Sequence, residues 1–121
     1  MGTRSLIAKK EKNGYFAIYC HWDGYPEGVG KTLMRHYTDA KKVDALLDLG
    51  DISSLGEEIG KKHNFDKRPA GQTNAYGRDR GETETEKSFE PTLKDLLKAA
   101  NGRDCEYIYI FSKGKWRWRT V

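Results

Sequence analysis

The chain has 121 residues, of which 36% are hydrophobic and 33% charged. This length suits one domain with a single small core and is too short for two, so we expect one domain over residues 1–121. The net charge of +4 comes from 22 basic residues interspersed with 18 acidic ones, a balance that permits a nucleic-acid partner without requiring it.

Residues 5–10 and 15–22 are short β-like runs on either side of Lys12-Asn13-Gly14. An Asn-Gly pair supplies the positive φ angles that tight hairpin turns require, so the two runs predict an N-terminal β-hairpin. The second run carries apolar groups on both of its faces, which indicates a strand covered on at least one side. We expect Phe16 and Ile18 to face the core.

The stretch HWDGYPEGVGKTL, residues 21–33, contains Gly30-Lys31-Thr32, which resembles the end of a phosphate-binding loop. A true loop of that kind needs glycine five residues before Gly30, and Tyr25 occupies that position. We therefore interpret the stretch as a turn that leads into a helix. Trp22 either anchors this turn in the core or takes part in binding, and a binding role is open for Tyr25.

Helical spacing of apolar residues continues after the turn, at Val29, Leu33, Met34 and Tyr37. A second helix is predicted from a cap at Thr38-Asp39 to a stop at Gly50. The spacing of Ser54 and Glu57 is that of a capping box and predicts a further short helix ending at Gly60.

Residues 61–90 are polar, loop-rich and without a sustained period. Such a segment is a functional loop, a partly mobile insertion, or a region with a short strand near Ala75-Tyr76. A helix follows from Pro91 to Asn101-Gly102, and residues 105–111 and 115–121 form a second hairpin about Lys113-Gly114. This order predicts an α+β fold with an antiparallel sheet built from the N-terminal and C-terminal β-hairpins and with helices packed on one face.

The last strand, in KGKWRWRTV, places two tryptophans on one face and cations on the other. With the indoles on the core, the cations form a solvated outer face and the leading basic patch. The alternative is nucleic-acid binding, because aromatic and cationic side chains together are typical of single-strand binders. That alternative uses Lys113, Lys115, Arg117 and Arg119.

Charged residues also gather in YGRDRGETETE, residues 76–86, but without the ligand spacing of a calcium loop. We interpret this run as a self-pairing charged loop that, if functional, recognises a charged partner. The three histidines show no metal-ligand spacing, and Cys20 and Cys105 no paired spacing, so we expect no metal, no cofactor, free thiols and a cytoplasmic location. We expect no enzyme; a small-ligand pocket or active site using His21, Asp79, Arg80 or Glu82 is a further alternative.

Four segments, MGTRSL, WDGYPEGVG, RDRGE and EYIYIFSKGKW, together resemble small, largely uncharacterised proteins of bacteriophages and prophages. The resemblance implies an accessory protein in a bacterial host that binds a host or competing-element protein, or a protein–nucleic acid complex. We expect no membrane partner, because no stretch approaches the 18 or so consecutive apolar residues of a membrane span. Inhibition of CRISPR or another defence system is among the activities it implies. It marks signature positions in the turn and in RDRGE without assigning their roles. Our own hypothesis is that the aromatic turn and the charged loop bind the partner, through Trp22, Asp23, Tyr25, Arg78, Asp79, Arg80 and Glu82.

Overall fold

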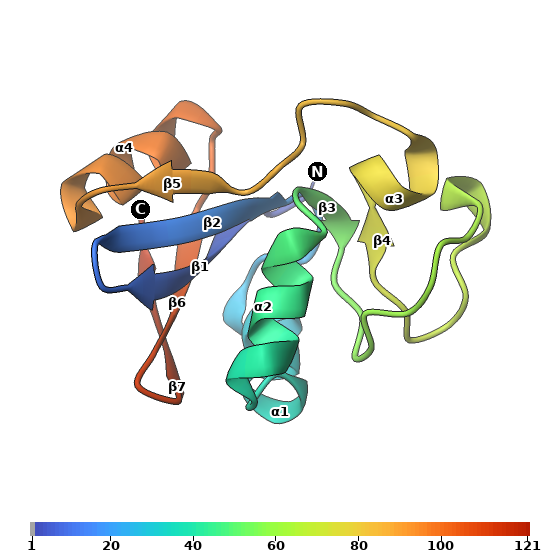
Figure 1. The fold of residues 1–121 in the computed structure, drawn as a ribbon, viewed down its shortest axis with the longest axis horizontal. Helices are drawn as coiled ribbons and strands as arrows, with labels where there is room; N and C mark the ends of the chain where they lie inside the picture. The colour runs from blue at the N-terminus through green and yellow to red at the C-terminus, as the bar shows by residue number, and fades with distance from the viewer. Residues whose placement is uncertain (1) are drawn as a thin grey trace.

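A computed structural model describes residues 2–121 and shows one seven-stranded mixed sheet with helices around it (Figure 1). The sheet order is β4-β3-β2-β1-β6-β7, and β5 lies beside β2. The strands are β1 Ser5–Glu11, β2 Gly14–Cys20, β3 Ile52–Ser54, β4 Asn74–Ala75, β5 Ser88–Glu90, β6 Tyr107–Ser112 and β7 Lys115–Thr120. The helices are η1 Pro26–Gly30, α1 Lys31–His36, α2 Ala40–Asp48, η2 Phe65–Lys67, α3 Tyr76–Arg80 and α4 Leu93–Gly102.

The α+β class, the mostly antiparallel sheet and the two terminal hairpins are confirmed. The hairpins are joined through a parallel pairing of their strands β1 and β6, from Ser5↔Tyr107 to Lys9↔Phe111. A second parallel contact, Cys20↔Ile52, attaches β3 to the end of β2. Each hairpin is thus local in sequence, while the joint between them spans nearly the whole chain.

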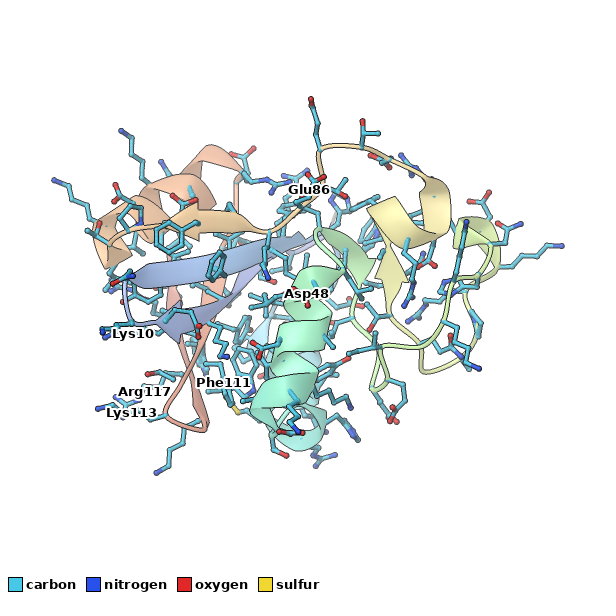
Figure 2. The ribbon with its side chains drawn as sticks, in the orientation of Figure 1. Lys10, Asp48, Glu86, Phe111, Lys113 and Arg117 are labelled. Carbon is cyan, nitrogen blue, oxygen red and sulfur yellow. The ribbon has the colours of Figure 1, made fainter. Side chains whose placement is uncertain are left out.

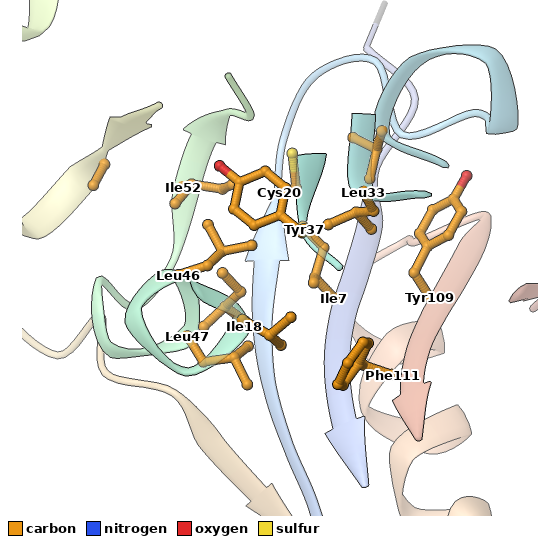
Figure 3. Close-up of a cluster of buried hydrophobic side chains, with 13 residues drawn as sticks. Ile7, Ile18, Cys20, Leu33, Tyr37, Leu46, Leu47, Ile52, Tyr109 and Phe111 are labelled. Atoms are coloured by element: carbon orange, nitrogen blue, oxygen red, sulfur yellow. The ribbon is translucent and has the colours of Figure 1, made fainter. Parts of the chain in front are cut away.

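Helices cover both faces of this sheet, not the single face that the sequence predicts. One face packs against α1 and α2, in a cluster that includes Ile7, Ile18, Leu33, Leu46 and Tyr109 (Figure 3). The opposite face packs against α4, through Leu6, Ala8, Ala17, Leu96 and Ile108. The reason is the alternation of side chains along a strand, since β1 and β2 carry apolar residues at consecutive positions and so need cover on both sides.

Tertiary contacts replace the short helix predicted from Ser54 to Gly60. The chain instead runs as β3 through Ser54 and then continues without helix to Gly60, with a bridge between Glu58 and Gln72. Buried Thr73 accepts a hydrogen bond from the Gly56 N–H at 3.0 Å and donates to the Glu58 carbonyl at 3.0 Å. A capping-box spacing is a local preference, and these buried hydrogen bonds override it.

The polar segment 61–90 is ordered by short elements. The short strand predicted near Ala75 is present as β4, which pairs with β3 and continues directly into α3. Strand β5 pairs antiparallel with β2, where Phe16 faces Phe89. The segment therefore extends the sheet on the side away from β7, and α3 and β4 lie together beyond β3 (Figure 1).

Candidate functional site

The turn between β2 and α1 is held by contacts of its backbone. The Gly24 N–H donates to the Thr3 carbonyl at 2.8 Å, and the Tyr109 hydroxyl donates to the Gly24 carbonyl at 2.7 Å. A Cβ on Gly28 would lie 2.4 Å from the Asp23 carbonyl oxygen, so only glycine fits there. A Cβ on Gly30 would lie 3.0 Å from the ring of Tyr109, a tight contact for which the ring would have to shift slightly. The glycines are therefore explained by close packing.

The same contacts bear on the phosphate-loop resemblance. The N–H groups of Gly28 and Gly30 donate to the Tyr25 carbonyl, and that of Val29 donates to the Asp23 carbonyl at 2.8 Å. A phosphate-binding loop needs such N–H groups free and convergent. Here they are used within the turn, as the interpretation of a turn leading into a helix requires.

Although its backbone is packed, the turn leaves aromatic side chains on the surface. Trp22 is 45% exposed and Tyr25 is 39% exposed, so Trp22 does not anchor the core. The Tyr25 hydroxyl donates to Asp23 at 3.1 Å, and this hydrogen bond raises the pKa of Tyr25. Three predicted interaction residues are thus together and accessible.

A groove of about 360 Å³ lies between this turn, α1 and β7. Two of its apolar residues are unusually exposed, Met34 at 45% and Trp118 at 44%. We call it the turn groove, and its lining residues are Pro26, Glu27, Lys31, Met34, Arg35 and Trp118. The pairing of Met34 with Trp118 could not be predicted, because the two residues come from opposite ends of the chain.

Trp116 and Trp118 share a face of β7, as predicted, but only Trp116 is anchored. Its indole N–H donates to the Tyr37 carbonyl at 2.8 Å, and its ring packs 5.1 Å from that of Phe111. Trp118 has an edge contact with Tyr107, at 5.7 Å between ring centroids, and is 44% exposed. One indole therefore belongs to the core and the other to the surface.

Of the charged motif RDRGE, the first two residues face inward. Asp79 has a fully buried carboxylate, which accepts from the backbone N–H groups of His63 and Ala75 and from the Arg78 guanidinium. Burial alone would raise the pKa of Asp79, but these hydrogen bonds outweigh it and hold the pKa below its usual value. Arg78 also donates to the carbonyls of Ile59 and Thr73. This pair fastens the 59–63 segment to β4 and α3.

The rest of the motif lies on the surface. Arg80 and Glu82 form an exposed ion pair at 2.7 Å, and the Arg80 guanidinium lies over the rings of Phe65 and Tyr76. Of the predicted interaction residues in this loop, Arg80 and Glu82 are accessible, whereas Arg78 and Asp79 are used within the chain.

A second groove, of about 600 Å³, lies on the α4 face of the sheet. It holds three of the four cations of the nucleic-acid alternative, Lys113, Lys115 and Arg117, while Arg119 is exposed farther along the same face of β7. We call it the basic groove; its other lining residues are Lys10, Tyr15, Leu93, Ile110 and Ser112. Figure 2 shows Lys10, Lys113 and Arg117 at the same end of the sheet. Within residues 2–121, no carboxylate lies within 4.0 Å of these cationic groups.

Of the residues of the enzyme alternative, Arg80 and Glu82 form an ion pair and Asp79 is buried beside Arg78, whereas His21 has a different partner. His21 pairs with the Tyr19 hydroxyl at 2.8 Å, and over the described part of the chain no hydrogen bond or ion pair joins it to Asp79, Arg80 or Glu82. Both cysteines are buried, and burial raises the pKa of Cys20 to about 12 and that of Cys105 to about 11. From residue 2 to residue 121, no three histidine, cysteine or acidic side chains converge as metal ligands.

Comparison with protein-family models, with curated proteins and with solved structures finds no match to this chain. None of the helices in residues 2–121 has the length and apolar character needed to span a lipid bilayer. The two grooves and the exposed aromatic residues beside them are the surface features from which a function can be inferred.

Proposed function

We propose that this chain is a non-enzymatic binding protein that attaches to a host macromolecule through the turn groove and so blocks or redirects it. The observation that carries this proposal is the exposure of Met34 and Trp118 across one groove, beside the exposed Tyr25. Tryptophan, tyrosine and methionine are enriched at protein interfaces, where a few of them supply most of the binding energy.

The charged rim of the groove supports the same proposal. Glu27, Lys31 and Arg35 surround the apolar residues, which is the usual arrangement of an apolar centre and a polar rim. The backbone of the turn is held by Tyr109 and by tightly packed glycines, so little conformational entropy would be lost on binding.

The resemblance to phage and prophage accessory proteins suggests the kind of partner. We propose a protein of the bacterial host or of a competing element, alone or within a protein–nucleic acid complex, in the cytoplasm of the host cell. An inhibitor of a defence system, CRISPR among them, fits this description. Such a protein acts by occupying a surface and needs no catalytic group of its own.

The experiment is capture of partners from a bacterial lysate with tagged protein, comparing Met34→Ala, Trp118→Ala and Phe89→Ala. Phe89 is a matched control because it is 44% exposed and lies on β5, with β2, β1 and β6 between it and β7. We expect a stoichiometric partner with the wild type and Phe89→Ala, and about 30-fold weaker binding with each groove variant. Equal retention by all four proteins, or no stoichiometric partner, would contradict the proposal.

Nucleic-acid binding in the basic groove is the second candidate. It is favoured by four cations around one hollow that have no carboxylate within 4.0 Å among residues 2–121. Tyr15 adds an aromatic ring on which a base can stack. Fluorescence anisotropy with single-stranded oligonucleotides should then show affinity that falls steeply with salt, and Lys115→Ala should reduce the salt slope by about one while exposed Lys62→Ala leaves it unchanged. Absence of binding at low salt would eliminate this candidate.

A further inference from the structure

Strand β7 forms one edge of the sheet, and among the described residues it pairs only with β6. The Val121 N–H donates to the Glu106 carbonyl, which identifies the hydrogen-bonded positions of this antiparallel pair. By alternation, Lys115, Arg117 and Arg119 direct their backbone groups toward β6. The backbone groups of Trp116, Trp118 and Thr120 therefore point away from the sheet.

Those outward groups are free to pair. Within residues 2–121, no other segment donates to or accepts from the backbone of Trp116, Trp118 or Thr120. All residues of β7 except Trp116 are exposed. Proteins usually protect a free edge, because strands of other chains can pair with it. The cationic side chains of β7 give this protection against strands that carry no negative charge.

The two faces of β7 differ in what they would offer an added strand. On one face, Trp118 borders the turn groove with Met34. On the other face lie Lys115, Arg117 and Arg119, none of which has a carboxylate within 4.0 Å among the described residues. A strand beside β7 would thus have alternate side chains next to apolar groups and next to cations.

We propose that the partner inserts an extended acidic segment that pairs with β7 as an additional strand. Its carboxylates would lie opposite Lys115, Arg117 and Arg119, and the apolar residues between them would enter the turn groove beside Trp118. Main-chain hydrogen bonds provide affinity in this mode of recognition, and the alternating side chains provide selectivity. The inference rests on the proposed function and names the chemistry of its partner.

A second copy of this chain fits the edge poorly. If two β7 strands paired antiparallel about Trp118, Arg117 of each would lie opposite Arg119 of the other. Like charges directly opposite one another destabilise a strand pair. The charge pattern therefore selects an acidic segment of another protein.

Amide hydrogen exchange followed by NMR tests the pairing directly. The probe is a ten-residue peptide with blocked ends that alternates glutamate and valine, and the control peptide carries lysine in place of glutamate. With the acidic peptide we expect exchange at Trp118 and Thr120 to slow about tenfold, while Arg117 and Arg119, already bonded to β6, change little. No slowing at Trp118 and Thr120, or equal slowing with the lysine peptide, would overturn the inference.

Variants of the full chain give a second readout. Thr120→Pro removes one outward N–H without touching a bond to β6, and Thr120→Ala is its matched control. We expect Thr120→Pro to weaken acidic-peptide binding about fivefold or more, and Thr120→Ala to leave it unchanged. The double variant Arg117→Glu, Arg119→Glu should weaken it roughly fivefold as well.

The outcomes separate this inference from the proposed function. If the lysate partner is lost with Met34→Ala but bound equally by Thr120→Pro and the wild type, the groove binds a partner in another manner and strand addition is wrong. If single-stranded oligonucleotides bind and the acidic peptide gives no alternating protection, the cations serve nucleic acid, and strand addition is again wrong. Loss of the partner with both Met34→Ala and Thr120→Pro, but not with Thr120→Ala, supports it.

Discussion

The glycine turn, residues 21–30, and the charged motif, residues 78–82, both look like surface recognition elements in the sequence, yet they are used in opposite ways. The turn buries its backbone against Tyr109 and exposes Trp22 and Tyr25. The charged motif buries Asp79 and turns Arg78 toward backbone carbonyls of neighbouring segments. Apolar side chains are outside in one region, and a carboxylate is inside in the other.

The difference shows that polarity alone does not decide exposure. The segments around β4 are short, and some of their backbone N–H and C=O groups have no partner in the sheet. Asp79 accepts from the N–H groups of His63 and Ala75, and Arg78 donates to the Ile59 carbonyl. In the turn, the carbonyl groups of Thr3, Asp23 and Tyr25 accept the backbone N–H groups. The aromatic side chains of the turn are therefore not needed for these hydrogen bonds and can face the solvent.

The largest effect on stability should come from breaking the buried ion pair of Arg78 and Asp79. Asp79→Ala removes the carboxylate that neutralises the Arg78 guanidinium and leaves the N–H groups of His63 and Ala75 without their acceptor. We therefore expect the free energy of unfolding to fall by about 3–5 kcal/mol. Urea denaturation followed by tryptophan fluorescence measures it. Glu82→Ala, which breaks the exposed pair with Arg80, should cost about 1 kcal/mol or less. Equal losses in the two variants would contradict the contrast between buried and exposed charges.

Lowering the pH should reproduce part of the loss of stability expected for Asp79→Ala. The folded-state pKa of Asp79 lies below its usual value of 3.8, so its contribution is present above that pH and is lost as pH falls through the folded pKa. We expect the stability difference between wild type and Asp79→Asn to shrink between roughly pH 5 and pH 2. Urea midpoints at both pH values test this, and a constant difference would show that Asp79 keeps its proton affinity on folding.

The turn can be disturbed through its backbone. In Gly28→Ala the new methyl group would meet the Asp23 carbonyl at 2.4 Å, and the forced shift should cost about 1–3 kcal/mol. Gly102→Ala at the end of α4 is the control, because its methyl group meets nothing within 4 Å and should be neutral or slightly stabilising. Thermal unfolding of both variants measures the difference, and a neutral Gly28→Ala would mean that the turn adapts easily.

The smallest effect on stability is expected at the exposed aromatic residue of the turn. Trp22→Ala should change the free energy of unfolding by about 0.5 kcal/mol or less, because nearly half of the side chain is already in solvent. Urea denaturation of Trp22→Ala and Gly28→Ala side by side tests it. A loss as large as that of Gly28→Ala would place Trp22 among the structural residues and remove it from the candidate surface.

Several elements were predictable because their signals are local. Lys113 and Gly114 take the positive φ angles of the second hairpin turn, Asp39 caps α2, and Thr92 caps α4 close to the predicted start at Pro91. The first hairpin forms as predicted but turns at Lys12-Asn13, so that Gly14 already pairs with Glu11 as the first residue of β2. The helix expected after Ser54 failed because buried Thr73, 17 residues from Gly56, offers better hydrogen bonds than a local cap. The burial of Asp79 could not be predicted for the same reason, because the backbone N–H groups that donate to it include that of His63, 16 residues away.

The sequence alone determined the hairpins, the two longer helices and the α+β class, because turn glycines, caps and apolar periods act over a few residues. Only the tertiary structure decided that helices cover both faces, that Met34 meets Trp118 at a groove, and that Lys10 joins the cations of β7. Those outcomes depend on the parallel pairing of β1 with β6, a contact across about a hundred residues that no local pattern encodes.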